Sequence, residues 1–149
     1  MTLKDEEMKN LRTLGVAALL LVVTLGCSGQ IEGVIRRDAK RIPIIYSDSR
    51  LSVAELTVVL PDGEQFHGKS EKFDRDKDMM ERNSTITDNT SGHFDALQGF
   101  HGNTMATLTG NRGNVIKCRF KITDVIMGFS SGGAGICQHS DGRVIDVFF

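Results

Sequence analysis

The sequence predicts an all-β domain, either a small antiparallel barrel or a sandwich of about seven or eight short strands. From Ile42 to the end of the chain, short segments rich in β-branched residues alternate with clusters of turn residues. Three of these clusters have the composition of hairpin turns, and sustained helical periodicity is scarce. Alternation of apolar and polar residues does not distinguish a barrel from a sandwich, so both architectures stay open at this point.

The first two strand segments lie before residue 61. Ile42 to Tyr46 is β-branched, and Pro43 confines it to a sheet edge or to the start of a strand. Leu51 to Leu60 runs into Pro61-Asp62-Gly63-Glu64, where proline and glycine stand at the positions that a hairpin turn requires. Part of this second segment is compatible with a helix, but the apolar residues directly before the turn favour a strand.

Glu71 to Phe94 interrupts the strand pattern and predicts a long polar loop, rich in charged residues, Asn, Ser and Thr. Loops of this length in a compact domain are usually functional or disordered. Asp74 to Asp78 resembles the start of a calcium loop. However, Met79 stands where glycine makes the turn, and Thr85 stands where a bidentate glutamate belongs. We therefore expect no metal here.

The clearest hairpin pairs Thr104 to Gly110 with Val115 to Thr123 across the turn 111–114. The second strand alternates cleanly, which predicts a core face made of Ile116, Cys118, Phe120 and Ile122. The opposite face then carries a basic stripe made of Lys117, Arg119 and Lys121. This stripe is a candidate partner surface for an anionic envelope polymer or another envelope protein. The alternative is a solvated strand face whose charges oppose aggregation.

The chain closes with a glycine-rich connection and a final hairpin. Ile126 to Gly135 lacks the Lys-Ser/Thr ending of a phosphate-binding loop, so we expect a bulge or tight bend rather than a nucleotide site. Ile136 to His139 and Val144 to Phe149 flank an Asp-Gly turn. The last strand is so apolar that it must be buried, which ties the C-terminus into the sheet.

The N-terminal segment predicts export. Leu14 to Leu25 is almost wholly apolar, and as a helix it would span about 18 Å, short of the roughly 30 Å hydrocarbon core of a bilayer. Lys9 and Arg12 precede it, so residues 1–26 have the layout of a secretory signal peptide. Three acids lie before Met8, which makes Met8 an alternative translation start.

The end of this segment, Thr24-Leu25-Gly26-Cys27, resembles the lipobox of bacterial lipoproteins, although Thr24 replaces the preferred leucine. The resemblance implies that Cys27 is acylated on its thiol, becomes the mature N-terminus and holds the protein to a membrane face. In a cell with two membranes, Ser28 after the cysteine resembles the class sorted to the periplasmic side of the outer membrane. The resemblance covers only the leader.

Residues 27–40 are predicted to be the lipidated cysteine and a flexible tether, because small, polar and basic residues mix there without periodicity. Residues 41–149 then form a single β domain. The tether ends in a basic cluster that either touches anionic headgroups or keeps the tether solvated. The cluster consists of Arg36, Arg37, Lys40 and Arg41.

Two cysteines remain once Cys27 carries lipid, and we predict a disulfide between Cys118 and Cys137 in the oxidising compartment of an exported chain. Closing a loop of about 20 residues contributes roughly 3 kcal/mol in the chain-entropy model. The alternatives are two buried free thiols or a reactive Cys137. In the second case His139, two residues along the same strand, would complete a Cys-His nucleophilic pair.

Composition excludes several classes of function. The formal net charge is −1, and with no Trp and one Tyr the chain lacks the basic and aromatic pattern that binds nucleic acids. The four histidines do not have the spacing of preassembled zinc ligands, and no cofactor motif is present. We therefore expect a non-enzymatic binding or structural module of the cell envelope. The alternatives are a small-molecule-binding barrel and a Cys-His hydrolase.

Overall fold

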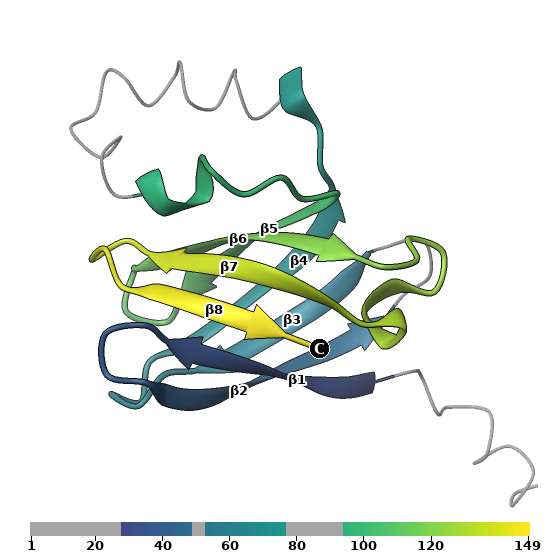
Figure 1. Ribbon diagram of the computed structural model, residues 1–149. Helices are drawn as coiled ribbons and strands as arrows, with labels where there is room; N and C mark the ends of the chain where they lie inside the picture. The colour runs from purple at the N-terminus through teal and green to yellow at the C-terminus, as the bar shows by residue number, and fades with distance from the viewer. Residues whose placement is uncertain (1–27, 49–52, 77–93) are drawn as a thin grey trace, which may run out of the picture.

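A computed structural model describes residues 28–48, 53–76 and 94–149 of the chain. Eight strands pair antiparallel in sequence order, and β8 pairs back with β1, so that the sheet closes into a barrel (Figure 1). The all-β prediction is confirmed, and of the two architectures left open the barrel is the correct one. The strands are β1 Ser28–Ile35, β2 Lys40–Asp48, β3 Ala54–Val59, β4 Gln65–Lys72, β5 Thr104–Gly110, β6 Val115–Ile122, β7 Gly133–His139 and β8 Val144–Phe148.

The strands form where side chains alternate between the interior and the outside of the barrel. In β3, Ala54, Leu56 and Val58 are buried, while the residues between them are exposed. Successive Cβ atoms of a strand point to opposite faces of the sheet, so every second residue enters the core. The same alternation in β6 buries Ile116, Cys118, Phe120 and Ile122, as predicted.

β1 corrects the prediction of a flexible tether over residues 27–40. Ser28 already pairs with Ser47, and the pairing of β1 with β2 continues to Ile35 opposite Lys40. The inward positions of β1 alternate between glycine and isoleucine, which conceals the apolar period in the sequence. A Cβ atom on Gly33 would lie 3.0 Å from Ile145 Cγ2, so the interior has little room for a side chain there. The β domain therefore begins at Ser28 rather than residue 41.

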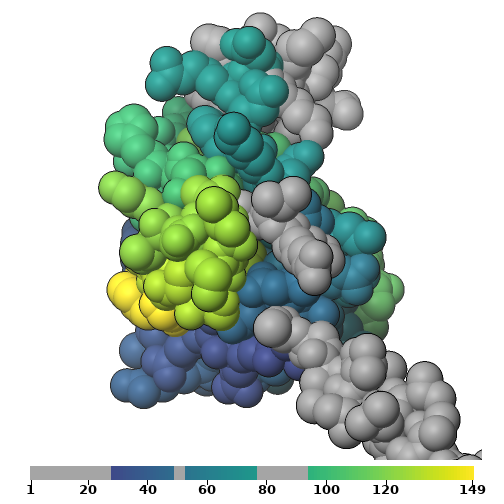
Figure 2. Space-filling view, turned by 90° about the vertical axis from the view of Figure 1, so that its right-hand side faces the viewer, coloured from purple at the N-terminus to yellow at the C-terminus, as the bar shows by residue number. Residues whose placement is uncertain are grey.

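The up-and-down strand order gives the barrel two dissimilar ends. At one end, the hairpin end, four short turns join consecutive strands at residues 36–39, 60–64, 111–114 and 140–143. Gly63, Gly113 and Gly142 have positive φ angles in three of these turns, which confirms the three predicted hairpins. The other end, the N-terminal end, carries the first residue of β1, the loop 123–132 and Phe149; Figure 2 looks onto this end, with the loop in yellow-green in front.

Aromatic side chains occupy the interior near the N-terminal end. Phe129 lies in a short 3-10 helix, η3 Gly128–Ser131, and its ring centroid is 5.0 Å from that of Phe120 and 5.2 Å from that of Phe149. The Tyr46 ring lies 5.6 Å from the same phenylalanine. β8 contributes Ile145 and Val147 to the core, so the final strand is buried as predicted. The glycine-rich connection, expected to be a bulge or bend, holds η3.

Candidate functional site

Cys118 and Cys137 form a disulfide inside the barrel, with an S–S distance of 1.97 Å. The two residues lie directly opposite each other on β6 and β7, and both are buried. The predicted disulfide is thus confirmed. Because the sulfur of Cys137 is bonded to Cys118, no thiolate is available for the Cys-His nucleophile that the sequence left open.

His139 belongs instead to a buried polar cluster beneath the hairpin end. Its side chain and that of Glu64 are each 2% exposed, and His139 Nε2 lies 3.8 Å from Glu64 Oε2. Asn114 Nδ2 donates to both Glu64 oxygens, at 3.1 and 3.0 Å. His139 Nδ1 lies 2.8 Å from Asp141 Oδ1. The cluster joins the turns 60–64, 111–114 and 140–143, so it connects hairpins that are far apart in the sequence.

The two ring nitrogens of His139 have different surroundings. The backbone nitrogen of Asp141 lies 3.0 Å from Nδ1, and the Asp141 carboxylate oxygen Oδ1 lies 2.8 Å from the same ring nitrogen. Nε2 is buried and has no hydrogen-bond partner among the described residues. The ring also meets the edge of Phe66, with centroids 5.4 Å apart. Because the side chains of His139 and Glu64 are closed off from solvent, we assign the cluster a part in stability rather than in binding.

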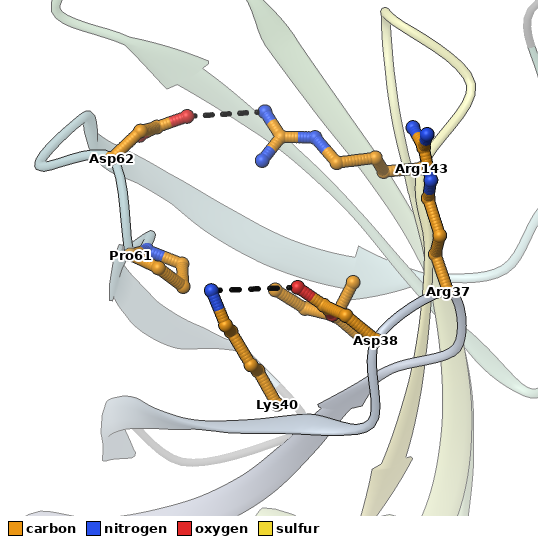
Figure 3. A pocket seen from close by; sticks show the side chains of 7 residues that line it. Arg37, Asp38, Lys40, Pro61, Asp62 and Arg143 are labelled. Atoms are coloured by element: carbon orange, nitrogen blue, oxygen red, sulfur yellow. Dashed lines mark hydrogen bonds and ion pairs between the residues drawn. The ribbon is translucent and has the colours of Figure 1, made fainter.

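A hollow of about 380 Å³ opens on the surface of the hairpin end (Figure 3). Its walls come from the turns 36–39 and 60–64 and from Arg143, the last residue of the turn 140–143. The buried Ile35 also lines the hollow. Three cations and two carboxylates line it, together with two apolar residues. The lining residues are Ile35, Arg37, Asp38, Lys40, Pro61, Asp62 and Arg143.

Most charges in the hollow are paired. Arg143 Nη2 lies 3.3 Å from Asp62 Oδ2, and its Nε donates to Asp141 Oδ2 at 2.7 Å. Lys40 Nζ lies 3.6 Å from Asp38 Oδ2. The backbone amide of Glu64 and the Arg143 guanidinium together lower the pKa of the Asp62 carboxyl, so this carboxylate is charged at neutral pH. The side chain of Arg37 extends beside Arg143 (Figure 3).

Arg37 is the unpaired charge of the hollow, since no ion-pair partner for its guanidinium is found in residues 28–48, 53–76 and 94–149. Its neighbours in the predicted basic cluster are paired on the barrel wall. Arg36 makes a two-point contact with Asp146, at 3.1 and 2.7 Å, and Arg41 lies 3.4 Å from Glu32. The cluster surrounds the turn 36–39 at the hairpin end, so the prediction that it belongs to a tether is wrong.

The predicted basic stripe on β6 is largely covered. Arg119 is only 8% exposed, and its Nη1 donates to the backbone oxygen of Leu97 at 2.8 Å. Its guanidinium also lies 5.0 Å from the centre of the Phe73 ring. Lys117 Nζ lies 5.1 Å from the centre of the Phe94 ring. Of the three cations only Lys121 is exposed, while Lys117 is half-buried, so the expectation that they form one outward basic surface is wrong.

The segment that covers the stripe follows the predicted polar loop. It contains the short 3-10 helix η2 Asp95–Leu97, which lies across the outside of β6 and β7 (Figure 1). The backbone N–H of Ala96 donates to Gln138 Oε1 at 3.0 Å, and Leu97 is buried against the barrel. Alternation places a residue on the outer face of a strand, but it does not reveal what packs over that face.

Three sequence predictions concern residues outside the described ranges. Cys27 and the signal peptide precede residue 28, and most of the predicted loop 71–94 lies in 77–93. The described part of that loop shows that β4 extends to Lys72, so its first two residues belong to a strand. Within the described ranges, no group of three His, Cys, Asp or Glu residues could hold a metal ion. Within the same ranges, no helix is long and apolar enough to cross a membrane.

The sequence held a signal for part of the polar cluster. Glu64 stands two residues before the buried Phe66, and His139 stands two residues after the buried Cys137. The period of two therefore directs both polar side chains into the barrel. The hollow had no such signal, because its walls come from three different turns.

The chain matches no protein-family model, no curated protein and no solved structure.

Proposed function

We propose that this protein is a lipid-anchored module of the cell envelope that binds a partner without catalysis. Cys27 would carry the lipid, and the hollow at the hairpin end would receive the partner. In a cell with two membranes, the protein would sit on the periplasmic side of the outer membrane. The partner would be another envelope protein or an anionic envelope polymer that presents a carboxylate or phosphate group.

One observation supports the lipid anchor, and a second supports export. The chain before Ser28 ends in the lipobox-like Thr24-Leu25-Gly26-Cys27. The barrel also contains a disulfide, and disulfides persist in oxidising compartments outside the cytoplasm. β1 begins at the residue directly after Cys27. An acyl chain on Cys27 would therefore hold the N-terminal end of the barrel at the membrane surface, with no intervening tether.

In this orientation the hairpin end faces away from the membrane. β1 has eight residues, and at the usual rise and tilt of barrel strands it spans about 20 Å along the barrel axis. The hollow would therefore stand about that far from the lipid surface, where an envelope partner can reach it.

The observation that carries the proposed recognition is the unpaired guanidinium of Arg37 in the hollow. Its fork of N–H donors fits carboxylate and phosphate groups in a two-point contact. Arg143 stands beside it, but Asp62 and Asp141 already neutralise that residue. One unpaired cation in a hollow that is also lined by Ile35 and Pro61 favours an anionic group on a partly apolar partner.

The interior of the barrel gives less support to the alternatives. A carried small molecule needs space between the strands, whereas the rings of Phe120, Phe129 and Phe149 pack against one another there. A Cys-His hydrolase needs a thiol, and Cys137 holds its sulfur in a disulfide.

Photo-crosslinking in the host cell tests the proposed partner. Benzoylphenylalanine in place of Pro61, an exposed and uncharged residue of the hollow, leaves the Arg37 guanidinium intact and would react with a group seated there. In place of Lys69, an exposed residue on the wall of the barrel, it would serve as the control. We expect a discrete crosslinked partner from the Pro61 position and none from the Lys69 position. Equal products from both positions, or none from either, would contradict recognition through the hollow.

A further inference from the structure

The N-terminal end of the barrel carries three consecutive exposed apolar residues, Val125, Ile126 and Met127, which we name the apolar tip. Ile126 is 75% exposed and Met127 is 61% exposed. The tip lies in the loop 123–132 between β6 and β7, which stands forward in Figure 2. Between residues 125 and 132 the sequence contains no charged residue. An exposed apolar surface of this kind marks a site of interaction.

The tip is held rigidly with its side chains outward. Asp124 Oδ1 accepts hydrogen bonds from the backbone amides of Ile126 and Met127, at 2.8 and 3.3 Å. Ser130 Oγ donates to the backbone oxygen of Met127 at 2.7 Å. Phe129 then enters the core, where it is 2% exposed. The loop is thus fixed on both sides of the tip, and its apolar side chains remain outside the barrel.

The tip shares one corner of the barrel with the start of β1. Ser28 pairs with Ser47 on β2, and the next residue of β2, Asp48, reaches the loop. A Cβ atom on Gly128 would lie 3.0 Å from Asp48 Oδ1, and the carboxylate faces the backbone amides of Phe129 and Ser130. One residue spans at most about 3.6 Å, so whatever is attached to Cys27 is held close to this corner.

We propose that the apolar tip inserts into the surface of the lipid bilayer that holds Cys27, an inference that rests on the lipid anchor of the proposed function. One attachment point leaves the barrel free to swivel, whereas a second contact fixes its axis. Lys121, exposed near the same end of β6, adds a positive charge that favours anionic headgroups.

A tryptophan reporter tests this contact, because the natural chain has no Trp. The full-length protein would be expressed in its host, purified from the membrane fraction and reconstituted in vesicles of phosphatidylethanolamine and phosphatidylglycerol. Ile126→Trp places the reporter at the tip. Val59→Trp, at an exposed position that ends β3 near the hairpin end, is the matched control. Doxyl-labelled lipids then quench only a tryptophan that touches the bilayer.

We expect blue-shifted emission and strong lipid quenching for Ile126→Trp, and neither effect for Val59→Trp. Equal quenching of both reporters would overturn the proposal, as would no quenching of either. A blue shift without lipid quenching would show that a second copy or another protein covers the tip instead. Flotation of the wild-type protein with the vesicles tests the anchor separately. Flotation without quenching defeats only this inference, whereas failure to float defeats the anchor and this inference together.

Discussion

His139 and Glu64 face each other beneath the hairpin end of the barrel, with Nε2 and Oε2 3.8 Å apart and both side chains closed off from water. Burial of two ionisable groups is costly unless each has partners. Asn114 supplies two hydrogen bonds to the glutamate, and Asp141 supplies contacts to the histidine. The cluster thus fixes three turns to one another, including the turn that contributes Asp62 to the hollow.

Replacing His139 should therefore destabilise the barrel. His139→Ala removes a buried ring and leaves the Glu64 carboxylate with Asn114 alone, so we expect a loss of about 2–4 kcal/mol in the free energy of unfolding. Urea denaturation measures this loss. His67→Ala is the matched control, because His67 is exposed on β4 and contacts only Thr57 Oγ1, at 3.3 Å, among the hydrogen bonds of the described residues. Its effect should stay within about 0.5 kcal/mol. Equal effects of the two substitutions would show that the cluster does not stabilise the fold.

The disulfide should contribute a similar amount to the free energy of unfolding. Cys118 and Cys137 are 19 residues apart, and replacing both with alanine should lower the free energy of unfolding by about 3 kcal/mol. Urea denaturation with and without reductant gives the comparison, and reductant should leave the double variant unaffected. Alkylation of the protein unfolded in urea without reductant should label neither cysteine. Labelling of both would mean that the thiols are free, and it would return the Cys-His nucleophile to consideration.

Asp48 should make the folded protein less stable as the pH rises, which is the opposite of the usual effect of an aspartate. Burial raises the pKa of its carboxyl, and the amides of Phe129 and Ser130 offset this only in part. A carboxyl with a raised pKa in the folded state holds its proton more tightly when folded. Its contribution to the free energy of unfolding is therefore fully present below about pH 4, which is the usual pKa of an aspartate in unfolded chains. This contribution is lost as the pH rises through the raised pKa of the folded state.

Asp48→Asn should consequently gain stability relative to the wild-type protein as the pH rises from about 4 to 7. Asp62→Asn provides a control of opposite sign. The Glu64 amide and Arg143 lower the pKa of the Asp62 carboxyl, so its contribution is present at neutral pH and is lost as the pH falls through the lowered value. Urea denaturation from about pH 2 to pH 7 measures both differences, because the contribution of Asp62 changes only below about pH 4 and that of Asp48 only above it. Parallel pH profiles for Asp48→Asn and the wild-type protein would refute the role assigned to Asp48.

The covering segment on β6 and β7 should depend on Arg119. Arg119→Gln breaks the contact with the Leu97 backbone oxygen and the stacking on Phe73. We expect a loss of about 1–3 kcal/mol in the free energy of unfolding and faster amide exchange over residues 94–100. Lys121→Gln, at the exposed end of the same stripe, should change neither quantity. Unchanged exchange in Arg119→Gln would mean that Arg119 does not hold the segment in place.

The sequence predicted most strands correctly, because one face of each strand is buried and a period of two is then visible. Ile116 to Ile122 is the clearest case. β1 was missed because Gly29 and Gly33 occupy half of its inward positions, and glycine carries no apolar signal. Closure was not predictable either, because the pairing of Glu32 with Phe148 joins residues at opposite ends of the chain.

The candidate site was harder to predict than the fold. Once Cys27 was assigned to lipid, only Cys118 and Cys137 remained, and this sufficed to predict a disulfide between them. Arg37 was recognised as part of a basic cluster, but the sequence does not show that Arg36 pairs with Asp146 while the next residue, Arg37, lines the hollow. Whether a charge is paired or unpaired depends on side chains from distant turns, and local sequence does not encode those contacts.

The intact mass of the protein isolated from its native membranes tests the lipid anchor most directly. The account predicts a chain that begins at Cys27, carries the added mass of acyl chains on that residue and leaves the membrane fraction when Cys27 is replaced by serine. A protein without acyl chains, or one that is released from the membrane while still bearing the residues before Cys27, would contradict it.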